Sequence, residues 1–129
     1  MIQTTIYNYL EPDLSIESTI EWNQTRGNTP DTFDISLEIA MLKEELNEFI
    51  EATTDVDRFD ALLDLKFVLI GTLSKMGLDA NQIRRGYSAV LSANNTKSKT
   101  KNAAGKITKP ANFVGPEAKL QAILDERQS

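Results

Sequence analysis

Two long segments with helical spacing of apolar residues, joined by only a few residues, constrain the fold of this chain most. The first can be capped by Asp34 or Ser36, and its apolar side chains recur at intervals of three or four: Ile35, Ile39, Leu42, Leu46, Phe49 and Ile50. The second can be capped by Asp55 and runs to about Met76, where Gly77 is typical of a helix end. Because the connection is so short, the sequence predicts an antiparallel helical hairpin.

Shorter segments complete a helical pattern around this hairpin. A first helix is expected from near Asp13 to about Arg26, a fourth opens at Leu78 and Asp79, and a last one covers residues 116–127 from Pro116. Residues 1–12 show no clear period and are interpreted as an N-terminal arm. No long stretch has the strict alternation of a strand. We therefore expect an all-α bundle of four to five helices, with residues 1–129 as a single domain.

The composition limits the chemistry. The 129 residues contain no cysteine and no histidine, which excludes thiolate zinc sites, imidazole-ligated metals and a Ser-His-Asp triad. A metal site would have to be built from oxygen ligands. The net charge of -5 opposes binding to duplex nucleic acid. No apolar run approaches the roughly 20 residues of a membrane span and no signal pattern opens the chain, so a cytoplasmic protein without a membrane partner is expected.

Acidic residues are concentrated on the flanks of the two central helices. Glu45 and Glu48 lie three residues apart on the same flank as Glu38, close enough to reach one cation, while Glu44 and Glu51 are rotated further out. On the next helix, one stripe continues through Gly71 to Lys75 and carries three acids: Asp57, Asp60 and Asp64.

Asp64 is the most informative of these acids, because its side of the helix also carries Phe67, Val68 and Gly71. A carboxylate in apolar surroundings costs several kcal/mol unless it is paired or bound to a metal. Lys66 projects to the opposite side, so Glu45 and Glu48 across the hairpin are the natural neighbours. Such a cluster would need a divalent cation, and hard Mg²⁺ or Mn²⁺ suits oxygen ligands. The alternative is a set of acids that simply decorate a solvated helix face.

The segment from Lys97 to Gly115 is basic, although the chain as a whole is acidic. It contains no acid and holds five lysines: Lys97, Lys99, Lys101, Lys106 and Lys109. Its glycines and proline indicate a loop. This positive loop suits an anionic ligand, but a plain solvated loop is an equal alternative.

The segments "LKEELNEFIEA" and "DRFDALLDLKFVLIGTLSKMGLD" resemble the MazG-like all-α nucleoside triphosphate pyrophosphohydrolases, a superfamily that includes dimeric dUTPases and phosphoribosyl-ATP pyrophosphohydrolase. The tail "SANNTKSKTKNAAGKITKPANFVGPE" is similar to the segment that follows in phage and bacterial members. The family pattern is Glu-x-x-Glu, a spacer, then Glu-x-x-Asp. Glu45, Glu48 and Asp64 match it, whereas Ala61 stands at the third acid and Asp60 is expected to substitute.

The resemblance implies a Mg²⁺-dependent enzyme that cleaves (d)NTPs between the α and β phosphates, giving a monophosphate and pyrophosphate. Glu44 or Glu45 is the expected catalytic residue that orients or deprotonates water. The resemblance also implies substrate contacts by Asn94 and Lys97, with Lys106 and Lys109 near the phosphates on a loop that closes over the site. It places base recognition near Trp22, although a lone Trp at helical spacing is more often a core residue.

Several alternatives remain open at this point. Leu37 and Met41 on the acidic face indicate a second buried surface, and the resemblance likewise implies a homodimer or homotetramer. Within the superfamily, the substrate could instead be phosphoribosyl-ATP or one deoxynucleotide. Outside it, the chain could be a non-catalytic helical module that binds metal or a protein partner.

Overall fold

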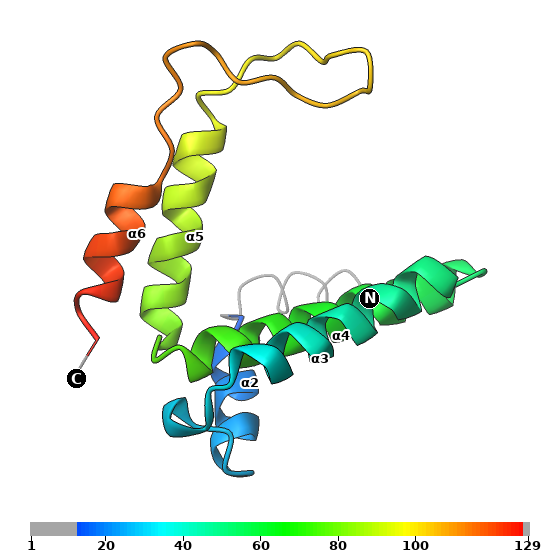
Figure 1. Ribbon diagram of the computed structural model, residues 1–129, viewed down its shortest axis with the longest axis vertical. Helices are drawn as coiled ribbons and strands as arrows, with labels where there is room; N and C mark the ends of the chain where they lie inside the picture. The colour runs from blue at the N-terminus through cyan, green and yellow to red at the C-terminus, as the bar shows by residue number, and fades with distance from the viewer. Residues whose placement is uncertain (1–12, 128–129) are drawn as a thin grey trace, which may run out of the picture. The chain divides into compact units, whose positions relative to one another are not determined.

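The computed structural model describes residues 13–127, and in that range it contains five α-helices, one 3₁₀ turn and no β-strand. The prediction of an all-α fold is confirmed. The chain divides after Met76 into two compact units. The predicted arm at residues 1–12 lies outside the described residues. Figure 1 gives the helix labels used below.

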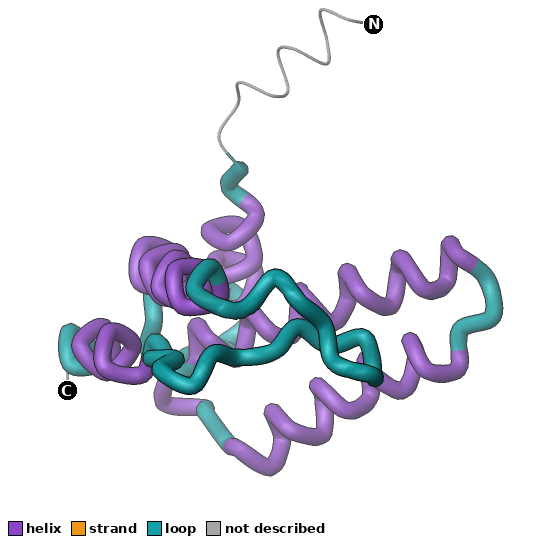
Figure 2. The backbone as a smooth tube through the Cα atoms, turned by 90° about the horizontal axis from the view of Figure 1, so that it is seen from above, coloured by secondary structure: helices purple, strands orange, loops and turns teal. Residues whose placement is uncertain are grey.

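The first unit contains α2 (Ser15–Gln24), the turn η1 (Pro30–Thr32), α3 (Ile35–Glu51) and α4 (Asp55–Lys75). Helices α3 and α4 lie side by side and antiparallel in both Figure 1 and Figure 2, as the short connection predicted. Asp34 caps α3 by accepting a 3.0 Å hydrogen bond from the backbone N–H of Ser36. The cap of α4 is Thr54, not Asp55, because the extended backbone of Thr54 lets its hydroxyl accept a bond from the N–H of Asp57 at 3.2 Å.

Helix α2 packs against α4 through a close approach at Gly71. A Cβ at this position would lie only 3.1 Å from the side-chain nitrogen of Asn23. Asn23 is buried and fixed, since it donates to the carbonyl of Thr19 and accepts from the amide of Asn28. The side-chain amide of Asn23 therefore packs on Gly71 where α2 meets α4.

The apolar stripe that the sequence assigned to the core of α3 is largely exposed in the single chain. Ile35 and Ile50 at the two ends of the helix retain 57% and 66% of their accessible surface, and Ile39 and Leu46 are also exposed. On α4 the same holds for Val56, Phe59, Leu62 and Leu63. The prediction that this apolar stripe forms the core was therefore incomplete, because α2 covers only part of the hairpin of α3 and α4.

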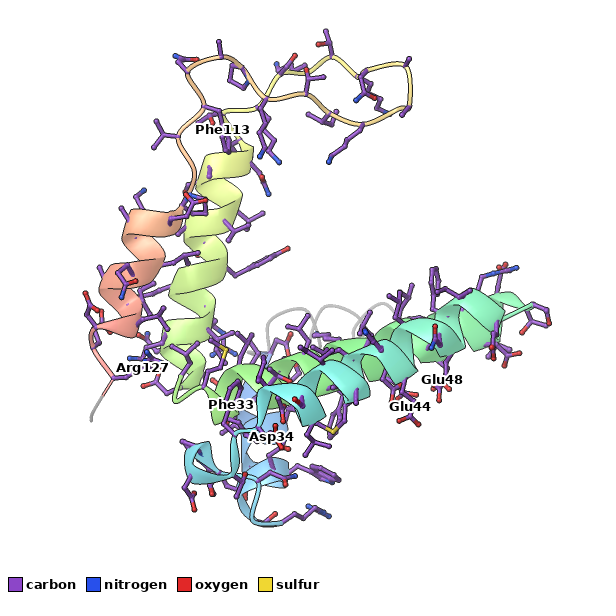
Figure 3. All side chains as sticks on the ribbon, viewed as in Figure 1. Phe33, Asp34, Glu44, Glu48, Phe113 and Arg127 are labelled. Atoms are coloured by element: carbon purple, nitrogen blue, oxygen red, sulfur yellow. The ribbon has the colours of Figure 1, made fainter. Side chains whose placement is uncertain are left out.

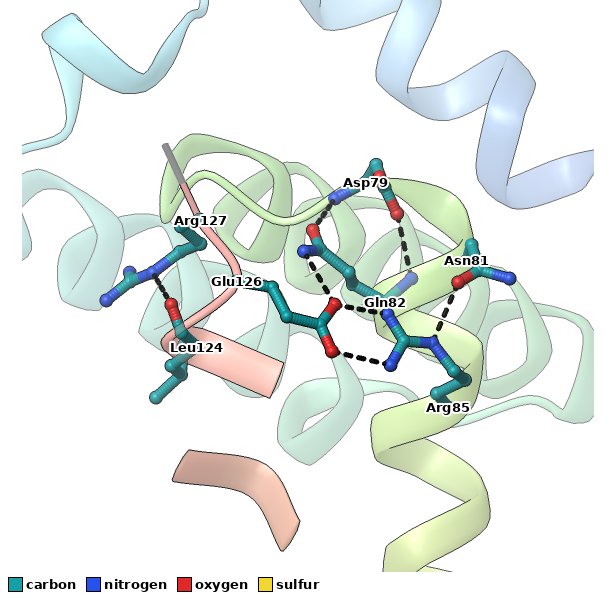
Figure 4. A network of polar contacts seen from close by, with 7 residues as sticks. All are labelled: Asp79, Asn81, Gln82, Arg85, Leu124, Glu126 and Arg127. Atoms are coloured by element: carbon teal, nitrogen blue, oxygen red, sulfur yellow. Dashed lines mark hydrogen bonds and ion pairs between the residues drawn. The ribbon is translucent and has the colours of Figure 1, made fainter. Parts of the chain in front are cut away.

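The second unit contains α5 (Ala80–Asn94) and α6 (Glu117–Leu124), which pack against each other. Asp79 and Gln82 form a reciprocal cap at the start of α5. Arg85 on α5 donates two hydrogen bonds, of 2.9 and 2.5 Å, to the carboxylate of Glu126, and Gln82 donates a third at 3.4 Å (Figure 4). This network ties the residues that follow α6 to the first turns of α5.

Candidate functional site

Three carboxylates converge between α3 and α4. Glu45 and Glu48 on α3 and Asp64 on α4 each offer an oxygen, and these oxygens all lie within 4.8 Å of one another. Glu45 and Asp64 are half-buried, whereas Glu48 is exposed. Figure 3 marks Glu48 and its neighbour Glu44 along α3. The sequence thus correctly predicted that these acids meet across the hairpin.

The carboxyl of Glu45 has a raised pKa. Burial, a hydrogen bond with Glu48 and repulsion from the charges of Glu48, Asp64 and Glu44 raise its pKa from 4.5 to about 7. Its Oε2 atom is buried and has no hydrogen-bond partner. An unsatisfied buried carboxylate oxygen among other carboxylates is the environment that a cation would relieve.

The remaining predicted acids lie outside this group. Asp60 is exposed and is not one of the converging acids among the described residues, while Ala61, at the third acid of the family pattern, is buried at 3% exposure. Successive residues on a helix point about 100° apart, so Asp60 does not occupy the direction of Ala61. A metal-binding role for Asp60 stays a prediction. Glu44 is exposed on the rim of the cluster.

Trp22 lies on α2 with 41% of its surface exposed. Its ring meets that of Phe67 edge to face, with centroids 4.9 Å apart, and the guanidinium carbon of Arg26 lies 4.2 Å from its centre. Phe67 follows Asp64 by one turn on α4. An aromatic surface and the acidic cluster therefore share α4, and a role of Trp22 in base binding stays a prediction.

The model of the phosphoribosyl-ATP pyrophosphohydrolase family matches residues 17–87, just over half of the chain. The chain belongs to this family. It is therefore a member of the MazG-like all-α nucleotide pyrophosphohydrolases, which are hydrolases of phosphorus-containing anhydrides and depend on metal. The matched range covers the converging acids but ends before the basic loop. No curated protein is similar enough to count as a relative.

The acids of this pyrophosphohydrolase fit a divalent metal ion. At the Mg²⁺–oxygen distance of about 2.1 Å, two ligands of one ion lie about 3 Å apart when adjacent and about 4.2 Å apart when opposite. The 4.8 Å limit for the three carboxylates is only slightly wider, so small side-chain rotations would bring these oxygens to the separations that ligands of one ion have. The unsatisfied Oε2 of Glu45 supports the same fit.

The other residues predicted to contact substrate lie in the second unit: Asn94, Lys97, Lys106 and Lys109. Asn94 ends α5, and its carbonyl accepts a hydrogen bond from the N–H of Lys97 at 3.0 Å. Lys106 and Lys109 lie on the return arm of the basic loop and are exposed. Their contact with substrate stays a prediction.

Helices long and apolar enough to cross a bilayer are absent from the described residues.

A buried ion pair in the same hairpin was not predicted. Glu38 on α3 is 1% exposed and Lys75 on α4 is 5% exposed, and their charged atoms lie 2.6 Å apart. The second oxygen of Glu38 accepts a 2.8 Å hydrogen bond from the hydroxyl of Thr72. The sequence placed Glu38 and Lys75 on the two acidic flanks, but which residues of these flanks meet depends on how far one helix is shifted along the other.

Proposed function

We propose that this pyrophosphohydrolase uses Mg²⁺ to hydrolyse ribo- or deoxyribonucleoside triphosphates between the α and β phosphates. The products are a nucleoside monophosphate and pyrophosphate. The observation that carries the proposal is the convergence of Glu45, Glu48 and Asp64 from two helices around an unsatisfied carboxylate oxygen. The family supplies the reaction class.

The carboxylates of Glu45, Glu48 and Asp64 would hold the cation. When bound, Mg²⁺ neutralises phosphate oxygens and lowers the pKa of water. Glu44 or Glu45 would orient the attacking water and take its proton. The water oxygen bonds to the α phosphorus while the bond to the bridging oxygen breaks, so no side-chain nucleophile is needed. Asn94, Lys97, Lys106 and Lys109 would bind the substrate, with the lysines opposing the charge on the leaving pyrophosphate.

Phosphoribosyl-ATP is the second candidate substrate, because the family model that matches residues 17–87 is that of phosphoribosyl-ATP pyrophosphohydrolase. Phosphoribosyl-ATP carries a triphosphate chain like that of a nucleoside triphosphate, so the acidic cluster would act on both substrates in the same way. A panel of eight ribo- and deoxyribonucleoside triphosphates and phosphoribosyl-ATP, each incubated with Mg²⁺, separates the two candidates by rate.

Product separation tests the site of cleavage. We expect monophosphate and pyrophosphate from the wild-type protein, and a loss of at least about 100-fold in rate for Asp64→Asn. Glu51→Gln is the matched control, since Glu51 is an exposed acid at the end of the same helix α3. Release of orthophosphate and a diphosphate nucleotide would refute the proposal, as would an Asp64→Asn variant with wild-type turnover.

We further propose that copies of the chain associate through the exposed apolar surface of α3 and α4. Residues such as Ile39, Leu46 and Phe59 are exposed in the single chain, and large apolar side chains exposed along two neighbouring helices favour an interface. Sedimentation equilibrium should give a dimer or tetramer, and Phe59→Glu should shift it toward monomer. A monomeric wild-type protein at micromolar concentration would contradict this proposal.

A further inference from the structure

The basic loop in the second unit folds back on itself. The N–H of Ser98 donates to the carbonyl of Thr108 at 3.0 Å, and the N–H of Thr108 donates to the carbonyl of Thr100 at 3.4 Å. At the tip, the side chain of Asn102 accepts from the N–H groups of Ala104 and Lys106. These bonds bring the start and the end of the loop together at a neck.

Phe113 lies at this neck, where Figure 3 marks it. The ammonium nitrogen of Lys97 is 5.7 Å from the centre of its ring, and that of Lys109 is 5.2 Å from the same centre. The ring is half-buried, and the N–H of Phe113 closes a turn on the carbonyl of Pro110 at 3.1 Å. One aromatic ring therefore holds two lysines that are twelve residues apart in sequence.

Two ammonium groups gathered at one ring form a concentrated positive charge. Since each lies within 6 Å of the ring centre, they are no more than about 11 Å apart. Residues 97–115 contain no acid that could neutralise them, although acids outnumber basic residues in the chain as a whole. A ligand with several adjacent negative charges would be attracted to both groups at once, and a chain of phosphates has this property.

We propose that Phe113 is a positioning residue that holds Lys97 and Lys109 together as a binding pair for the polyphosphate part of the substrate. The assignment to substrate rests on the proposed function, but the binding pair itself does not require metal or hydrolysis. Lys97 and Lys109 contact the phosphates, and Phe113 acts through them. Replacing Phe113 should therefore weaken phosphate binding only while both lysines are present, although it removes no charge.

Binding of inorganic tripolyphosphate to the full chain, measured by calorimetry in EDTA, tests the pair directly. Phe113→Leu removes the ring and no charge, and we expect about three- to ten-fold weaker binding. Phe113→Trp keeps a ring and should bind within about two-fold of the wild type. Lys101→Gln removes one exposed charge of the same loop that is not at the ring, and should cost less than about two-fold at 0.15 M salt.

A double replacement separates positioning from general stability. In a Lys97→Gln, Lys109→Gln background, Phe113→Leu should cause no further loss of tripolyphosphate binding, because no lysines remain to be placed. Circular dichroism checks that α5 and α6 persist. If Phe113→Leu loses helical signal, Phe113→Met fills the same space and replaces it. Wild-type binding by Phe113→Leu, or an equal loss in the background without the two lysines, would overturn the proposal.

Kinetics distinguish this proposal from the proposed function. With the best nucleotide and Mg²⁺, Phe113→Leu should raise KM by the same three- to ten-fold factor, and kcat should fall by no more than about that factor, because the lysines also oppose the charge on the leaving pyrophosphate. If no nucleotide is hydrolysed but tripolyphosphate binding still depends on Phe113, the proposed function fails and the binding pair stands. If hydrolysis occurs with unchanged KM in Phe113→Leu, the pair fails and the function stands.

Discussion

Removal of Lys75 tests the energetic importance of the buried ion pair between α3 and α4. The charged atoms of Lys75 and Glu38 are 2.6 Å apart, and the two residues are 5% and 1% exposed. In Lys75→Met the carboxylate of Glu38 keeps only its hydrogen bond from Thr72. Breaking one side of such a pair costs about 3 to 5 kcal/mol, because the remaining charge stays buried without compensation. For a chain of this size, that corresponds to a fall in Tm of about 10 to 20 °C.

Urea unfolding followed by circular dichroism at 222 nm measures this cost, with Glu38→Gln and the double variant completing a thermodynamic cycle. The double variant removes both charges, so it should be more stable than the sum of the single losses predicts, by about 2 to 3 kcal/mol. Thr72→Val is a control for the hydrogen bond alone and should cost about 1 kcal/mol. A Lys75→Met protein within 0.5 kcal/mol of the wild type, or strict additivity in the cycle, would refute the reasoning.

Three further expectations concern pH and backbone conformation. The pKa of Glu45 is raised to about 7 in the folded protein, so between about pH 4.5 and 7 the metal-free folded state holds a proton that the unfolded state has lost. Thermal unfolding should therefore show a Tm that falls as the pH rises through this window. Glu45→Gln should remove this dependence of Tm on pH. The hydrogen bonds from Arg85 and Gln82 hold the pKa of Glu126 at about 2, so their stabilisation is present above about pH 4.5 and is lost toward pH 2. NMR titration of Arg85→Met should find the Glu126 pKa raised toward its usual value, with only the hydrogen bond from Gln82 still lowering it. Gly77 has a φ of +93°, so Gly77→Ala should destabilise the protein by about 1 kcal/mol in urea unfolding. Gly86→Ala within α5 is the control, because the added Cβ meets only an ordinary contact with Leu120, and it should be neutral or stabilising. A Gly86→Ala protein less stable than Gly77→Ala would contradict the assignment of backbone strain to Gly77.

The parts of the structure that depend on local periodicity were predictable from the sequence. The hairpin follows from apolar spacing and from helix signals such as Asp34 and Gly77. The meeting of Glu45, Glu48 and Asp64 follows from helix geometry once the two helices are antiparallel. These inferences need only the 100° step of a helix and a short connection.

Features that depend on packing register were not predictable in the same way. The pairing of Glu38 with Lys75 requires knowledge of how far one helix is shifted along the other, which apolar spacing does not give. The gathering of Lys97 and Lys109 at Phe113 depends on the fold of an irregular loop, for which no residue period exists. The exposed stripe on α3 shows that apolar spacing identifies a face that tends to be covered, but not what covers it.

Calorimetric titration of the full chain with Mg²⁺, compared with Asp64→Asn and Glu51→Gln, tests the central claim most directly. If Glu45, Glu48 and Asp64 form one metal site, the wild type and Glu51→Gln should bind with the same affinity. Asp64→Asn should bind at least about ten-fold more weakly while remaining folded. Equal Mg²⁺ affinity in the wild type and Asp64→Asn would contradict the assignment of the three carboxylates to a metal site.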